Sequence, residues 1–357
     1  MAQDTSAVPG PQARNLSPPV RVVAMGGGTG LSTLLKGLKQ YVITDSSAAE
    51  GTPAPAIAEL AAVVTVTDDG GSSGRLRRDF NILPPGDIRN CIAALSEDEA
   101  LLSRLFQHRF QAGSGLDGHS FGNLFLAALT SITGDFAEAV KLSSEILATR
   151  GHIYPSTISD VQLEAVMKDG STVRGETSIT ASSGRIVELR LVPSDVEPLA
   201  ETLQAIAEAD LITIGPGSLF TSLVPNLLVR GIPEAVATSR AVKVFVCNLM
   251  TEANESLGLT AAEHIRVLNT HAGLAVFDCA LVNQTPVSPE LAANYAREKA
   301  AQIVPDAAAI DALGVRAILG DYLEEADGVA RHATNRVALD LLRMAVARRQ
   351  TASSMVQ

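Results

Sequence analysis

Short apolar runs alternate with amphipathic stretches along most of the chain, as expected where strands alternate with helices. VRVVAM (Val20–Met25) is apolar and β-branched, GGGTG follows it at once, and LSTLLKGLKQY then repeats apolar positions at helical spacing. Residues 45–58 have the Ala, Pro, Ser and Gly composition of a loop, and LAAVVTV beyond them reads as a second buried strand. Together these segments predict a βαβ unit.

The same arrangement returns in the second half of the chain. Residues 209–228, ADLITIGPGSLFTSLVPNLL, read as a buried strand, a glycine turn and a helix. VKVFVCNL, ALVNQ and VRAILGDYL are further strand candidates, and NRVALDLLRMAVARR predicts a closing amphipathic helix. Strands that alternate with helices predict an α/β fold, a Rossmann-like, doubly wound and mostly parallel sheet.

Between these two halves of the chain, the spacing of apolar residues changes. The chain is mostly helical from Pro85 to about Arg150, and VQLEAVMKDGSTVRGETSI and RIVELRLVP then alternate around Asp169-Gly170. We expect a hairpin plus one more strand, a small β excursion over about residues 155–195. The remaining boundaries are a disordered leader at 1–20, one nucleotide-binding domain at 21–333, a C-terminal helix at 334–349 and a disordered tail at 350–357.

Composition narrows the function classes. The 357 residues are 46% apolar and carry a net charge of −11 with no Lys/Arg block, which argues against nucleic-acid binding. The leader has four prolines and no apolar core, so we expect neither a signal peptide nor membrane insertion. Cys91, Cys247 and Cys279 lie far apart, which fits a reducing cytoplasm and argues against structural zinc.

One motif suggests a different function. Gly118-His119-Ser120-Phe121-Gly122 matches the G-x-S-x-G pattern of serine hydrolases, which needs a buried strand running straight into the serine. The preceding QHRFQAGSGLD is polar and Gly-rich and has no such strand. We therefore interpret this stretch as a loop that caps a helix, and a binding role for Ser120 stays open.

Polar motifs gather where the predicted strands end. In a doubly wound sheet, ligands bind outside the carboxyl ends of the strands, where the connection direction reverses. Glycines there can simply make tight turns, but two Gly-rich turns that each open a helix present backbone N–H groups to an anion. We expect one diphosphate to be shared by both turns. The candidates are Gly26, Gly27, Gly28, Thr29 and Gly30 in the first turn, Gly215, Pro216, Gly217 and Ser218 in the second, and Asn248 after VFVC.

The known phosphate fingerprints match poorly. The dinucleotide pattern G-x-G-x-x-G meets Leu31 where its third glycine belongs, and Asp68 is farther along than the usual interval of about 20 residues. GGGTGLST has no lysine before its Ser/Thr pair, so it is no P-loop. NAD binding therefore stays an open alternative, and these residues alone do not indicate which nucleotide base is bound.

The pair Asp68-Asp69 ends the second strand and has three interpretations. The carboxylates can hold Mg²⁺ together with ligand phosphates, accept from a ribose, or cap the turn formed by the following glycines. Asp87 lies near the start of the helix predicted after Pro85, and its carboxylate is a candidate N-cap of that helix.

Several long strings together resemble the YvcK, or gluconeogenesis-factor, family of the CofD-like superfamily. They run in order from about Arg21 to about Arg331: AMGGGTGLSTLLKGL, TVTDDGGSSGRLRRDFNILPPGDIRNCIAAL, GHSFGNLFLAALTSITGDF, IGPGSLFTSLVPNLL and VCNLMTE. The resemblance implies a Rossmann-like fold that binds UDP-sugars, notably UDP-N-acetylglucosamine and UDP-glucose. It also implies a cytoplasmic role in cell shape and peptidoglycan synthesis under gluconeogenic growth, with peptidoglycan-synthesis or regulatory proteins as partners. We also expect a homo-oligomer.

The resemblance also assigns residues. It points to Tyr295 and Arg331, which could stack on a base and pair with a phosphate. The aspartate pair of the related 2-phospho-L-lactate transferases corresponds to Asp68 and Asp69, so a magnesium-dependent transferase of phospho-lactyl type is the alternative to a binding protein without turnover. Those transferases lack GGSSGRLRR and GHSFGN in this form. Ser72, Ser73 and Asn123, which lie in these two strings, complete the nucleotide-binding candidates.

Overall fold

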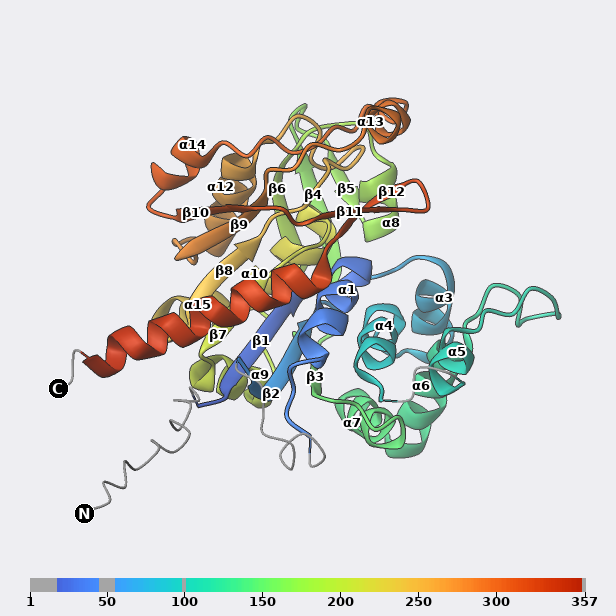
Figure 1. Cartoon of the computed structure of the whole chain (residues 1–357). Helices are drawn as coiled ribbons and strands as arrows, with labels where there is room; N and C mark the ends of the chain where they lie inside the picture. The colour runs from blue at the N-terminus through green and yellow to red at the C-terminus, as the bar shows by residue number, and fades with distance from the viewer. Residues whose placement is uncertain (1–17, 45–54, 98–100, 355–357) are drawn as a thin grey trace, which may run out of the picture.

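A seven-stranded parallel sheet forms the centre of the chain in a computed structural model that describes residues 18–44, 55–97 and 101–354 (Figure 1). The strand order is β10-β9-β8-β7-β1-β2-β3, and every pairing is parallel. This confirms the predicted Rossmann-like fold. The strands are β1 (Val20–Gly26), β2 (Ile57–Val64), β3 (His152–Pro155), β7 (Leu211–Ile214), β8 (Val242–Val246), β9 (Cys279–Asn283) and β10 (Arg316–Gly320).

The strand order places a reversal beside β1. The chain first builds β2 and β3 on one side of β1, then crosses to β7 on the other side and continues outward through β8, β9 and β10. Connections therefore leave β1 and β7 in opposite directions, which opens a crevice at their carboxyl ends. Both predicted Gly-rich turns follow these two strands.

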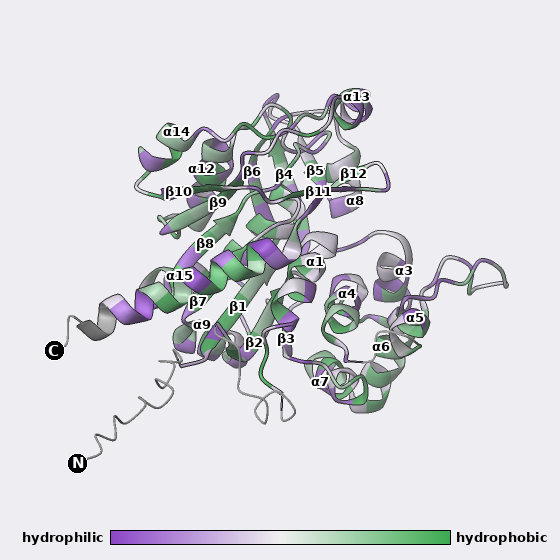
Figure 2. Ribbon diagram, in the orientation of Figure 1, coloured by the Kyte–Doolittle hydropathy of each residue, from purple (hydrophilic) through white to green (hydrophobic). Residues whose placement is uncertain are grey.

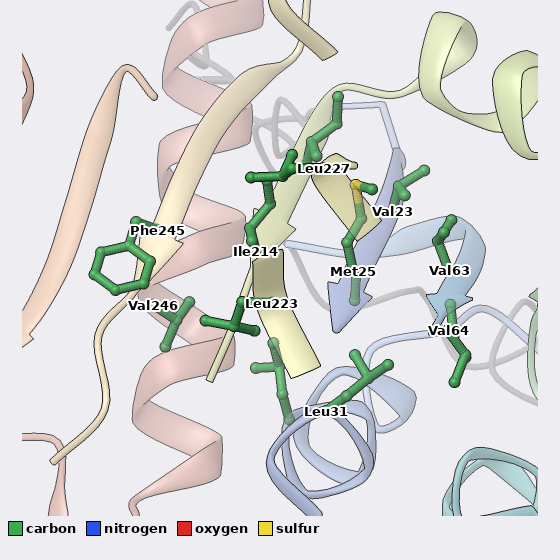
Figure 3. Packing of buried hydrophobic residues seen from close by; sticks show 14 of the residues in the cluster. Val23, Met25, Leu31, Val63, Val64, Ile214, Leu223, Leu227, Phe245 and Val246 are labelled. Carbon is green, nitrogen blue, oxygen red and sulfur yellow. The ribbon is translucent and has the colours of Figure 1, made fainter. Parts of the chain in front are cut away.

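The core lies between this sheet and its helices. Parallel strands covered on both faces read as continuous apolar runs, and β7 and β9 are buried along their whole length. Figure 3 shows Met25, Ile214 and Leu223 in this core with Leu31 of the first helix. Burying a side chain of this size contributes about 1.5–3 kcal/mol.

Helices cover the sheet. Polar and apolar residues alternate along the ribbon of α15 (Figure 2). Helix α15 contacts α1 as well as β1, β7 and β8. No helix in the described ranges is both long and apolar enough to cross a bilayer. The helices are α1 (Gly28–Lys39), α3 (Gly71–Phe80), α4 (Gly86–Leu95), α5 (Leu102–Gln107), α6 (Phe121–Thr133), α7 (Phe136–Ile146), α8 (Glu176–Ala181), α9 (Ala200–Glu208), the π-helix η1 (Leu219–Leu223), α10 (Val224–Leu227), α11 (Ile232–Thr238), α12 (Ala261–Ala272), α13 (Pro289–Ala296), α14 (Ala307–Asp311) and α15 (Thr334–Ser354).

The two ends of the chain differ from their predicted boundaries. Strand β1 already includes Val20, and the rest of the predicted leader up to residue 17 lies outside the described residues. Helix α15 continues to Ser354, past the predicted end at 349, and residues 355–357 lie outside the residues that the structure describes. Arg349 holds this last part of the helix, because its Nε donates to Asp210 at 2.5 Å and its Nη1 to the Pro19 carbonyl at 2.8 Å.

The β excursion contains the expected hairpin and an additional helix. Strands β4 (Gln162–Met167), β5 (Thr172–Arg174) and β6 (Ile186–Val192) form an antiparallel sheet in the order β5-β4-β6. The prediction that the hairpin continued through GETSI was wrong, because these residues start α8. Asp69 Oδ1 accepts from the backbone N–H of Thr177 at 2.9 Å and from its hydroxyl at 2.7 Å, so a distant carboxylate caps the helix.

A second hairpin was missed. Strands β11 (Leu323–Ala326) and β12 (Val329–His332) pair antiparallel between β10 and α15. Their mostly exposed residues give no apolar run to read. This hairpin carries Arg331 toward the carboxyl edge of the main sheet.

Candidate functional site

A cavity of about 640 Å³ lies at the carboxyl ends of β1, β7 and β8. Segments from distant parts of the chain line it: both Gly-rich turns, the residues after β8, helices α8 and α13, and the β11–β12 hairpin. Its volume is in the range of small-molecule sites, about 300–1,000 Å³. The predicted residues that line it are Gly27, Gly28, Thr29, Gly30, Pro216, Gly217, Ser218, Asn248, Tyr295 and Arg331.

The two Gly-rich turns touch each other. A Cβ added to Gly30 would lie 2.7 Å from the carbonyl carbon of Pro216 and 3.0 Å from the Cα of Gly217. Only glycine therefore lets the start of α1 approach the second turn this closely. The two turns therefore lie against each other, and the sharing of one ligand by both stays a prediction.

Several backbone amides at this edge already have side-chain partners. The Asp87 carboxylate accepts from the Gly28 N–H at the start of α1. Asn248 Oδ1 accepts from the Gly217 N–H at 3.0 Å, and Asn248 Nδ2 donates to the Gly217 carbonyl at 2.8 Å. Asn248 thus holds the second turn in shape.

Asp87 lies in the first turn of α4, but its carboxylate packs against the first Gly-rich turn. The expectation that it caps α4 was wrong, because Pro85 is the N-cap residue and no side chain caps it. A Cβ on Gly27 would lie 2.7 Å from Asp87 Oδ2, so the carboxylate is packed against this turn. Burial, reinforced by the charge of Asp68, raises the pKa of Asp87 to about 6.

Glu176 is a second carboxylate, after Asp87, that lines the cavity. Thr67 Oγ1 donates to its Oε2 at 3.1 Å. Burial first, and then the charges of Asp87 and Asp68, raise the pKa of Glu176 well above its ordinary value.

Two further carboxylates line the cavity beside the second turn. Glu255 accepts from the Phe220 N–H at 3.3 Å and from the Thr221 hydroxyl at 3.2 Å, which places it at the start of η1. Burial and the neighbouring Glu252 raise the pKa of Glu255 to about 7. Burial likewise raises the pKa of Glu252.

Tyr295 on α13 and Arg331 on the β11–β12 hairpin both line the cavity. The Tyr295 hydroxyl accepts from the Ala330 N–H at 3.2 Å, which joins α13 to the β11–β12 hairpin. Arg331 is half exposed and lies 3.7 Å from the Asp327 carboxylate. His332 Nε2 donates to the Cys247 carbonyl at 3.0 Å, and burial lowers the pKa of His332 to about 4, so its ring is neutral.

The other predicted residues lie behind or beside the cavity lining. Gly26 and Gly215 are buried at the strand ends. Asn123 Nδ2 donates to Ser72 at 3.1 Å and contacts Ser73 at 3.5 Å. Ser72 in turn pairs with His119 Nδ1 at 2.9 Å. This buried hydroxyl–amide network supports the start of α3.

Ser120 is a helix cap. Its hydroxyl accepts from the Asn123 N–H at 3.3 Å, its side chain is fully buried, and only an isolated bridge to Arg109 precedes it. No nucleophile elbow is formed, which confirms the interpretation of this loop.

Both carboxylates of the aspartate pair cap turns or helices of the chain itself. Asp68 Oδ1 accepts from the Gly70 N–H at 2.9 Å, and Asp69 Oδ1 serves Thr177. Across the described ranges, no three His, Cys, Asp or Glu side chains gather as a metal-ligand set. Binding of Mg²⁺ through one or two of these carboxylates together with ligand phosphates stays a prediction.

Sequence reasoning missed several polar residues that line the cavity, among them Glu176, Thr180, Glu252 and Glu255. Glu252 and Glu255 follow Asn248 within the string VCNLMTEANE. Their closeness in sequence to the end of a predicted strand could therefore have identified them as site residues. Glu176 and Thr180 had no such signal, because their place depends on the docking of α8 against Asp69.

Comparison with known proteins adds independent findings. A family model described as 2-phospho-L-lactate transferase CofD matches residues 22–323. The gluconeogenesis factor of Halalkalibacterium halodurans is 47% identical over 321 residues, 90% of this chain and 95% of that protein. The gluconeogenesis factor of Bacillus subtilis is 45% identical over 326 residues, 90% and 98% of the two chains. A crystal structure of a UPF0052-family protein from Bacillus halodurans has a TM-score of 0.84 at 46% identity and covers 91% of this chain and 99% of that one.

Proposed function

The chain belongs to the CofD family and, within it, to the gluconeogenesis factors of the YvcK type, and on that premise we propose that it is a cytoplasmic binding protein for UDP-sugars. The observation that carries the proposal is the cavity in which two touching Gly-rich turns face an aromatic ring and a guanidinium. A nucleotide sugar offers a complementary group to each: a diphosphate for the turns, a base for Tyr295 and further phosphate charge for Arg331.

The diphosphate needs amides that are not already taken. The first N–H groups of a helix have no partner within the helix, and Thr29 and Gly30 occupy these positions of α1 in the cavity wall. Ser218 offers its backbone amide at the second turn, while its hydroxyl already donates to Glu252. These groups support a diphosphate bridging the two turns beside, and not in place of, Asp87.

The biological role in this proposal is regulation without turnover. The liganded state would be read by peptidoglycan-synthesis or regulatory proteins, which links UDP-N-acetylglucosamine or UDP-glucose supply to cell shape under gluconeogenic growth. Assembly as a homo-oligomer belongs to the same proposal. The match to the CofD transferases favours one rival, a transferase of phospho-lactyl type, which the experiment must separate.

The test is calorimetric titration of the whole chain with UDP-N-acetylglucosamine, UDP-glucose and GDP, each with Mg²⁺ and with EDTA, followed by phosphorus NMR of the mixtures. We expect saturable UDP-sugar binding without new phosphorus signals. Arg331→Ala should weaken binding by about tenfold or more, since it removes a charge-assisted contact. Arg343→Ala, an exposed arginine on α15 paired with Asp340, is the matched control. Absence of UDP-sugar binding would refute the proposal, and multiple turnovers would favour the transferase.

A further inference from the structure

The cavity is far more acidic than an anion site requires. Arg331 is its only cationic side chain among the lining residues, and His332 is neutral. Four carboxylates face the same space: Asp87, Glu176, Glu252 and Glu255.

Two of these carboxylates accept hydrogen bonds from backbone amides at helix starts beside the cavity. Asp87 accepts the Gly28 amide at the start of α1, and Glu255 accepts the Phe220 amide at the start of η1. Each helix start facing the cavity is therefore partly neutralised by a carboxylate of the chain itself. A ligand that enters gains only the remaining amides and must tolerate the nearby negative charge.

This arrangement discriminates between nucleotides by their charge. In a nucleotide sugar both phosphates are esterified, whereas UDP and UTP end in a free phosphate that acquires an additional negative charge above a pKa of about 6. We propose that the cavity carboxylates, with Glu255 as the principal one, select diphosphate diesters over free nucleoside di- and triphosphates. This inference rests on the proposed function and names the specificity of the same site.

Hydrogen bonding favours the same ligand class. A carboxylate accepts hydrogen bonds, and sugar hydroxyls donate them, while a fully ionised terminal phosphate has no proton to donate. Glu255 lies beside the hydroxyls of Thr180 and Thr221, at 3.5 and 3.2 Å from its Oε1. A sugar hydroxyl can therefore donate to Glu255 beside these hydroxyls, whereas a fully ionised terminal phosphate can only repel the carboxylate.

The discrimination should depend on pH. The pKa of Glu255, about 7, responds to burial and Glu252, while the amide of Phe220 and the hydroxyls of Thr221 and Thr180 oppose the shift. The pKa of Asp87, about 6, responds to burial and Asp68, opposed by the Gly28 amide and Arg89. Both carboxylates become fully charged as pH rises through these values, so the preference for a diester grows toward pH 8.

The test compares UDP-N-acetylglucosamine, UDP and UTP by calorimetry at pH 8 in EDTA, which keeps metal ions from bridging phosphate and carboxylate. We expect the native chain to prefer the nucleotide sugar over UDP by about tenfold or more, the scale of one added charge repulsion in a partly buried site. Glu255→Gln keeps the shape and the acceptor for Phe220 but removes the charge. It should reduce this preference by roughly fivefold, chiefly by tightening UDP.

The control is Glu234→Gln, an exposed glutamate on α11 away from the cavity, which should leave both affinities unchanged. Equal affinity for UDP and UDP-N-acetylglucosamine in the native chain would overturn the inference and leave the proposed function standing. Equal weakening of both ligands in Glu255→Gln, with an unchanged Tm, would also overturn it, because it would assign a positioning role. Failure to bind any UDP-sugar would remove the proposed function itself.

Discussion

Gly30→Ala tests the contact between the two Gly-rich turns. The added Cβ would lie 2.7 Å from the Pro216 carbonyl carbon and 3.0 Å from the Gly217 Cα, and both atoms belong to backbone that cannot rotate away. Overpacking of this kind costs about 1–3 kcal/mol. Alanine recovers up to about 1 kcal/mol of helix propensity in α1, which leaves a net loss of up to about 2 kcal/mol.

Two readouts follow from this displacement. Because unfolding entropy scales with chain length, the expected loss lowers the Tm by no more than about 3 °C. The ligand effect is larger, since separating the turns removes at least one charge-assisted hydrogen bond to a bridging diphosphate and weakens UDP-N-acetylglucosamine binding about tenfold or more.

Gly184→Ala is the matched control. Its added Cβ would come too close only to the terminal methyl of Met167, at 2.6 Å, which is the far end of a flexible side chain in the β excursion. It should change neither the Tm nor the affinity measurably. Native affinity in Gly30→Ala would refute the claim that close approach of the turns builds the site.

Three other measurements test separate parts of the account. Ser120→Ala removes a helix cap and should lower the free energy of unfolding by about 1 kcal/mol in a denaturant titration without changing UDP-sugar affinity; loss of an esterase activity would contradict this. Arg349→Ala should destabilise the fold by up to about 1 kcal/mol, because its pairing with Asp210 is partly exposed, and an unchanged Tm would show that the end of α15 is not anchored there. Glu255 has a folded pKa of about 7 against an ordinary 4.5, so its contribution to stability is full below pH 4.5 and is lost as pH rises to about 7. Relative to the native chain, Glu255→Gln should gain on the order of 2–3 kcal/mol between pH 4.5 and 7.5, and a constant difference across this range would contradict the assignment.

The main sheet was predictable because its strands are buried on both faces. The apolar runs VRVVAM and LITI are interrupted only by Arg21 and by the buried Thr213, so they show no helical spacing of polar positions, and the glycine turns mark their ends. Strand β3 was not predictable from HIYP, which is short and lies at the edge of the sheet.

The site could be predicted only where its residues are close together in the sequence. A glycine turn after a strand is readable because strand, turn and helix are contiguous. Asp87 was assigned to its own helix because local capping is the commoner role, whereas the structure turns it toward the Gly28 amide, far away in the sequence. Glu176 depends on Asp69 holding α8, a tertiary contact that leaves no periodic signal.

A crystal structure of the chain with UDP-N-acetylglucosamine tests the central claim most directly. The account predicts the diphosphate between the two turns, within hydrogen-bond distance of the Thr29 or Gly30 amide on one side and Ser218 on the other, with the uracil against Tyr295. A nucleotide bound elsewhere, with Asp87 and Asn248 as the only groups on these turns, would contradict it.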